Sequence, residues 1–153
     1  MKTEITRIIN TIRHTFEGTP WHGPAVMDIL KDIKPEDVIK KLPNSHNIAE
    51  LVAHMSTWRE FVAQKLNGNI EFDVTHEANF PVITNLTKED WQALVNRLQK
   101  SQSDLLKALE HCSDEKLGEL VPGREYKFGI MLHGIIHHDL YHLGQIVLLR
   151  KLP

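Results

Sequence analysis

Two histidines near the end of the chain, His138 and His142, are four residues apart. On an α-helix this spacing places both side chains on one face, one turn apart, so both rings can reach a single metal ion at about 2.0 to 2.1 Å. Such a pair is common by chance. It indicates a metal site only if a third ligand points to the same place from elsewhere in the chain.

The apolar residues around this pair show which way it points. At about 100° per residue, Ile135 and Ile146 lie within roughly 40° of His142 on a helical projection. His138 shares this face, so we expect both imidazoles on the buried stripe of the helix.

The same segment holds two further histidines, His133 and His137. They project roughly 140° to 180° away from His142, beside Lys151, on the side that should face solvent. They are therefore poor ligand candidates.

His54 is the best candidate for the third ligand. Leu51, Trp58 and Phe61 lie within roughly 60° of it on a helical projection, so it also points into the core. Burying an imidazole costs free energy unless it finds a partner, and one ion would be a partner for all three rings. We predict one divalent transition metal, with zinc or nickel as the first candidates, bound by His54, His138 and His142.

Three neutral nitrogen ligands leave at least one coordination position for water or a substrate atom, as in catalytic metal sites. Asp139 follows the first histidine of the pair, giving H-D-x-x-H, which is similar to the H-E-x-x-H helix of metalloproteases, where the glutamate is the general base. Aspartate is one methylene shorter, so Asp139 could equally orient a ligand histidine. Glu50, one turn before His54, is the second carboxylate that could contact the site.

Other residues give weaker signals. Tyr141 and Gln145 flank the histidine face and could touch the site, although packing between helices is the simpler interpretation. Cys112 has no motif around it and is most simply a small apolar residue. No residues that bind a cofactor other than the metal can be assigned.

Four amphipathic segments must position these side chains. Apolar residues at steps of three and four predict helices over residues 2–17, from Asn44 or Ser45 to residue 66, from Thr87 to about His111, and over residues 128–152. Asn44 or Ser45, and Thr87, are the expected N-caps. Because no run of strands is credible, we predict an all-α four-helix bundle.

Two long connections separate these helices. Residues 21–43 are expected to carry one or two short helical pieces, and residues 69–86 are polar without sustained periodicity. Both suggest crossovers rather than a plain up-and-down bundle. Connections of this length usually cover or build a site.

The composition is that of a folded soluble protein, with 41% hydrophobic and 25% charged residues. The length of 153 residues predicts a single domain over residues 1–153. A net charge of -2 with scattered basic residues argues against nucleic acid and membrane surfaces as partners. One cysteine, no signal-peptide core and no apolar run of about 18 residues predict a cytoplasmic protein.

The segment N-I-A-E-L-V-A-H-M-S-T-W around His54 and the segment H-H-D-L-Y-H-L-G-Q-I around His138 and His142 resemble the DinB/YfiT-like superfamily of metal-dependent proteins. The resemblance implies a four-helix bundle, often dimeric, with one metal-binding histidine in the second helix and an H-x-x-x-H pair in the last. The same three histidines are then the ligands. The best-understood relatives are transferases and isomerases that use bacillithiol, mycothiol or a similar thiol, and others are labelled hydrolases.

These observations lead to three hypotheses about function. In a thiol-dependent, bacillithiol-type transferase, the ion holds a low-molecular-weight thiol as thiolate, and a small-molecule substrate binds between the bundle and its long loops. In a hydrolase, metal-bound hydroxide attacks an amide or ester, and Asp139 or Glu50 transfers the proton. A metal-binding stress protein without turnover is the third. In each case the resemblance implies a homodimer.

Overall fold

The structure, a computed structural model, describes residues 3–153 as an assembly of helices. The long helices are α1 (Glu4–Glu17), α3 (Ile48–Leu66), α5 (Lys88–Leu109) and α6 (Phe128–Leu149). The short elements are α2 (Val26–Leu30), α4 (His76–Asn79) and the 3-10 helices η1 (Pro35–Asp37) and η2 (Asp114–Gly118). Within residues 3–153 there is no β-strand, only an isolated bridge between Leu120 and Lys127. The all-α prediction is confirmed.

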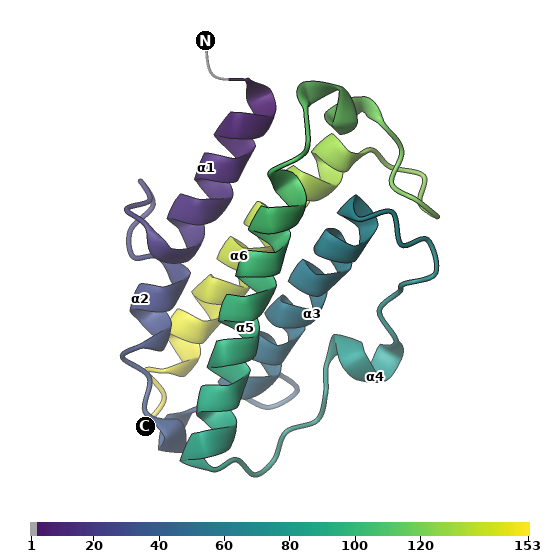
Figure 1. Cartoon of the computed structure of the whole chain (residues 1–153). Coiled ribbons are helices and arrows are strands. Elements are labelled where there is room, and N and C mark those ends of the chain that lie inside the picture. The colour runs from purple at the N-terminus through teal and green to yellow at the C-terminus, as the bar shows by residue number, and fades with distance from the viewer. Residues whose placement is uncertain (1–2) are drawn as a thin grey trace.

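The four long helices lie side by side and form a bundle (Figure 1). Helix α3 packs against α5 and α6, and α1 packs against the same two helices from the other side. Helices α1 and α3 are therefore diagonal to each other. Because α3 is covered on most sides, even its Arg59 and Lys65 are buried.

The two long connections differ in their paths. The connection from α3 to α5 carries α4 and returns along the bundle to the level of the first turn of α3. There the amide of Ile83 donates to Glu50 Oε1 at 3.0 Å. Helices α3 and α5 consequently run in the same direction (Figure 1). The connection from α1 to α3 stays at one end of the bundle and carries α2 and η1, the short helical pieces expected there.

Helix α3 begins later than the sequence predicted. Its N-cap is Asn47, not Asn44 or Ser45: Asn47 Oδ1 accepts from the amide of Glu50 at 2.8 Å, and Glu50 Oε2 accepts from the amide of Asn47 at 3.1 Å. This reciprocal pair satisfies two amides at once, which an isolated cap cannot do. Asn44 instead occupies a turn with a φ of 56°.

The other predicted boundaries agree more closely. Thr87 is the N-cap of α5, as predicted. Helix α6 begins at Phe128, as predicted, but ends at Leu149, three residues before the predicted end at residue 152. Helix α5 ends at Leu109, two residues before the predicted end. The predicted start of the first helix at Lys2 lies outside the described residues, and α1 is described from Glu4.

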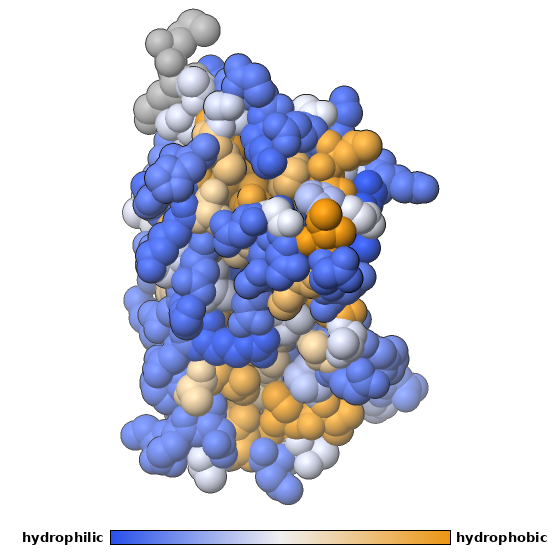
Figure 2. Space-filling view, turned by 45° about the vertical axis from the view of Figure 1, so that its right-hand side comes forward, coloured by the Kyte–Doolittle hydropathy of each residue, from blue (hydrophilic) through white to orange (hydrophobic). Residues whose placement is uncertain are grey.

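The buried apolar side chains form two clusters along the bundle, one around Leu51 and Ile146 and the other around Phe61 and Leu105. On α6, His138 and His142 lie between the residues of the two clusters, and on α3 His54 lies beside Met55, the last residue of the first cluster on that helix. The face drawn in Figure 2 is mainly hydrophilic, with apolar patches among the polar side chains. No helix among the described residues combines the length and the apolar character needed to cross a bilayer.

One buried ion pair links the long helices. The guanidinium of Arg59 on α3 donates to Asp139 on α6 and to Gln102 on α5, and it lies over the ring of Phe16 on α1 at 4.6 Å. Arg59 is fully buried and Asp139 is nearly so. Removing one partner would leave the other as an uncompensated buried charge, so this pair constrains how the helices can pack.

Asn47→Ala should destabilise the protein by about 1 to 2 kcal/mol, because Asn47 caps α3 and its Nδ2 also donates to the carbonyl of Ile83 at 2.7 Å. Urea unfolding measures the loss. Ser45→Ala is the matched control, since the Ser45 hydroxyl is exposed and donates only to nearby carbonyls. A larger loss for Ser45→Ala than for Asn47→Ala would contradict the cap described here.

Candidate metal centre

Three histidines converge between the middle of α3 and the middle of α6. One ring nitrogen from each of His54, His138 and His142 lies within 4.8 Å of the others. The Nε2 atoms of His54 and His138 are 2.8 Å apart. The centroids of the three rings are separated by 4.5 to 4.8 Å. The structure thus brings together the three residues that the sequence predicted as ligands.

Hydrogen bonds on the outer side of two rings fix which nitrogen can bind an ion. Nδ1 of His54 donates to the carbonyl of Asn79 at 2.6 Å, and Nδ1 of His142 donates to Gln145 Oε1 at 2.6 Å. A neutral imidazole carries one proton, so in both rings Nε2 keeps its lone pair. This is the arrangement in which histidine usually binds a metal.

The third ring supports the same interpretation. Nε2 of His138 faces Nε2 of His54, which carries a lone pair, and Nδ1 of His138 has no hydrogen-bond partner among residues 3–153. Two ring nitrogens as close as these Nε2 atoms need a proton or a cation between them, and a metal ion would take the place of that proton. The donor set therefore fits a transition metal that prefers imidazole, such as zinc or nickel.

The surroundings keep these rings uncharged. Burial lowers the pKa of His54 to about 4, although the hydrogen bond to Asn79 works in the opposite direction. Burial, followed by the repulsion of His142, His54 and Arg59, lowers the pKa of His138 to about 3. Burial also lowers the pKa of His142. At neutral pH all three histidines are in the neutral form that a metal requires.

The connection between α3 and α5 covers one side of the centre. The ring of Phe80 stacks on His54 with a centroid distance of 3.8 Å, and His46 stacks on Phe80 at the same distance. Trp58 Nε1 donates to Asn79 Oδ1 at 3.0 Å, which holds the end of α4 against α3. The sequence did not identify Asn79 or Phe80. Only the length of the connection indicated that it could build a site.

The two carboxylates proposed from the sequence have other partners. Asp139 Oδ2 pairs with Arg59, and burial raises the pKa of Asp139 to about 6 while Arg59 opposes this rise. Burial acts to raise the pKa of Glu50, but the backbone amides of Ile83 and Asn47 donate to its carboxylate and lower the pKa overall. A catalytic role for either carboxylate stays a prediction.

The remaining candidates lie at different distances from the centre. Gln145 contacts His142 directly, and the ring of Tyr141 lies 5.0 Å from that of His142 while most of the side chain is exposed. His133 and His137 are exposed on α6 and do not join the three-histidine group. Cys112 lies beyond the end of α5 and donates to the carbonyl of Ala108.

His54→Ala, His138→Ala and His142→Ala should each abolish stoichiometric metal binding, because each removes one of three nitrogen donors. Elemental analysis of purified variants measures the metal content. His133→Ala and His137→Ala are the matched controls on the same helix and should keep the wild-type content. Full occupancy in the first three variants would contradict the site.

Acid should destabilise the metal-free protein. His54 and His138 titrate near pH 4 and pH 3 when folded, against an ordinary value of 6.5, so between these values the unfolded chain binds more protons. We expect the free energy of unfolding to fall as the pH drops below 6.5, by about 1.4 kcal/mol per pH unit for each of the two histidines, partly offset by Asp139, whose raised pKa has the opposite effect.

Urea unfolding between pH 7 and pH 4.5 tests this expectation. His54→Ala should reduce the dependence on pH, whereas the exposed control His133→Ala should leave it unchanged. If the free energy of unfolding depends on pH equally in the wild type and in His54→Ala, then His54 does not titrate as described.

Comparisons with known proteins agree with the geometry of this site. The family model described as the DinB superfamily matches residues 21–146, which include all three histidines and more than half of the chain. No curated protein and no solved structure matches the chain. With this match and three converging histidines on two helices of an all-α bundle, the chain belongs to the DinB superfamily.

Proposed function

We propose that this chain is a metal-dependent enzyme that transfers a low-molecular-weight thiol to a small electrophilic molecule. The observation that carries this proposal is the orientation of His54 and His142, whose Nδ1 atoms donate outward and leave Nε2 for an ion. With His138 they form a set of three neutral donors, and such a set leaves at least one coordination position for a substrate atom. The thiol is supported by the resemblance of the two histidine segments to thiol-dependent relatives.

An ion bound by these nitrogens would hold a thiol in its nucleophilic thiolate form at neutral pH. In the transfer, the thiol proton is lost to solvent and the sulfur forms a bond to an electrophilic carbon. The bond from that carbon to its leaving group breaks, and the leaving group takes the electron pair.

The side chains around the centre would support this chemistry by orientation and by excluding water. His54 is held by Asn79 and Phe80 and His142 by Gln145, so both rings are oriented before an ion binds. The ring of Trp58 lies 6.3 Å from that of His54 and 6.2 Å from that of His138, which gives the centre an apolar side.

The partners of the two nearby carboxylates favour transfer over hydrolysis. Hydrolysis is assisted by a base that can accept a proton from water. Glu50 already accepts hydrogen bonds from two backbone amides, and Asp139 is paired with Arg59 in the core. A thiol transferase depends less on such a base, because a thiol loses its proton far more readily than water does.

Several finer points stay predictions from the sequence. Zinc and nickel are the first candidate ions, since both accept imidazole ligands. We also expect a homodimer and a cytoplasmic location. The exposed apolar side chains of Ile130, Tyr141 and Leu148 on α6 offer a surface that a second copy could cover.

Adding 2-mercaptoethanol to the cobalt-substituted protein should produce a new sulfur-to-cobalt charge-transfer band, because the thiolate would occupy the remaining coordination position. Absorption spectroscopy measures the band and its saturation. His138→Ala should lose both cobalt and band, and His137→Ala is the matched control that should keep both.

If the fully cobalt-loaded protein shows no such band, the proposal that a thiolate binds the ion is wrong. If that protein hydrolysed an ester, the hydrolase hypothesis would replace the transferase. If it did neither, and chelation sharply lowered its melting temperature, the ion would have a structural role only.

A further inference from the structure

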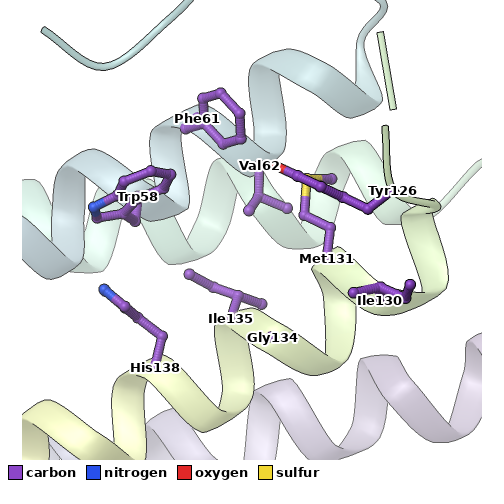
Figure 3. A pocket seen from close by; sticks show the side chains of 9 residues that line it. All are labelled: Trp58, Phe61, Val62, Tyr126, Ile130, Met131, Gly134, Ile135 and His138. Carbon is purple, nitrogen blue, oxygen red and sulfur yellow. The ribbon is translucent and has the colours of Figure 1, made fainter. Parts of the chain in front are cut away.

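An apolar pocket lies between α3 and α6 directly beside the metal centre (Figure 3). Its volume is about 240 Å³. The principal walls are Trp58, Phe61 and Val62 from α3 and Met131, Ile135 and His138 from α6. The pocket therefore shares one side chain, His138, with the three-histidine group.

The pocket adjoins the metal centre through aromatic contacts. The ring of Trp58 lies 6.2 Å from that of His138 and 5.3 Å from that of Phe61, so a series of ring contacts joins the histidines to the wall of the pocket. In Figure 3, His138 stands at one end of the pocket and Tyr126 at the other. A molecule that contacts an ion at the histidines could thus extend into this space.

The lining selects an uncharged occupant. Apart from His138, the hydroxyl of Tyr126 and the indole N–H of Trp58, which donates to Asn79, the side chains that form the pocket are apolar, and none carries a permanent charge. Placing a charged group here would cost desolvation free energy without a partner. For comparison, an engineered apolar cavity of about 150 Å³ is large enough to bind benzene. A phenyl-sized group fits, with room for the link to a reacting centre.

Gly134 leaves the rim of the pocket open. It lies in the interior of α6, one turn before His138, where glycine is less favourable than alanine. A Cβ added at Gly134 would meet no atom of the described residues within 4 Å, so close packing does not require a glycine. A larger side chain at this position would instead project over the rim.

We infer that this pocket binds a phenyl-sized apolar group of the substrate, so the electrophile that this chain uses is an aryl or similarly bulky apolar compound. This assignment rests on the proposed function, because the electrophile must lie next to the ion-bound thiol. The pocket sets the size and apolar character of the substrate, while the histidines set the position of the reaction.

The four methionines of the chain provide a direct probe of this pocket. Met131 lines it, whereas Met55 belongs to the other apolar cluster. In the zinc-loaded full-length protein with 13C-labelled methionine methyl groups, benzyl alcohol should shift the Met131 signal saturably through its ring current and leave Met55 unchanged. The polar compound 1,3-propanediol should shift neither. No saturable shift of Met131 would overturn the inference.

Substitutions of two glycines on α6 give a matched pair. Gly134→Leu should weaken benzyl alcohol binding at least fivefold, because the side chain fills the rim. Gly144→Leu is the control, since Gly144 also has no atom of the described chain within 4 Å of an added Cβ but does not line the pocket. Gly134→Ala, which keeps the rim open, should bind as wild type and shows whether the helix tolerates a Cβ there. Equal affinities for Gly134→Leu and Gly144→Leu would contradict the site.

Cobalt provides the test of contact with the metal centre. The ring protons of bound benzyl alcohol should relax faster in the cobalt-loaded protein than in the zinc-loaded protein, and Gly134→Leu should remove the difference. A Met131 shift without this enhancement would place the ligand away from the ion and overturn the inference.

The outcomes separate this inference from the proposed function. If a cobalt–thiol band appears without a Met131 shift, the pocket does not bind the apolar group, and the proposal of a thiol transferase still holds. If Met131 shifts and cobalt enhances the relaxation, but no thiol band appears, the pocket binds the apolar group and the proposed thiol is wrong. If raising the protein concentration alone shifts Met131, a second copy fills the pocket, and the substrate assignment is wrong.

Discussion

The hydrogen bond from His54 Nδ1 to the carbonyl of Asn79 constrains the centre of this molecule. A carbonyl can only accept, so this bond decides which nitrogen of His54 keeps a lone pair toward His138. It also holds the end of α4 against α3, where Phe80 stacks between His46 and His54. The connection from α3 to α5 and the candidate ligand are therefore parts of one packed unit. Without this connection His54 would be a buried imidazole of undefined orientation.

The buried side chain of Arg59 sets the alignment of the helices around that unit. It contacts Gln102, Asp139 and Phe16, so one residue of α3 touches all three other long helices. A buried ion pair adds little net stability, but separating its partners is strongly unfavourable. Because Asp139 and His138 are neighbours on α6, the register that pairs Asp139 with Arg59 also brings His138 into the centre. We infer that the carboxylate beside the ligand fixes the position of the helix.

Helical periodicity was enough to predict the long helices and the three converging histidines, because apolar neighbours mark the buried face. It could not predict Asn79 and Phe80, since residues in an irregular connection have no repeating pattern. Arg59 was missed for another reason: a charged residue on a helix normally faces solvent, and its partner Asp139 is 80 residues away in the sequence. The N-cap at Asn47 was detectable, because N-I-A-E carries the capping-box spacing that Asn44 and Ser45 lack.

The attachment of Asn79 and Phe80 to His54 has a consequence for how an ion could enter or leave. Both residues belong to a connection that runs over the surface, yet they supply the acceptor and the stacked ring for a buried ligand. If this connection moves away from α3, His54 loses the hydrogen-bond acceptor and the stacked ring together. The exchange of an ion bound by these histidines would thus depend on the motion of a surface segment, and the lifetime of such an ion would be a kinetic property of the connection as well as of the nitrogen donors.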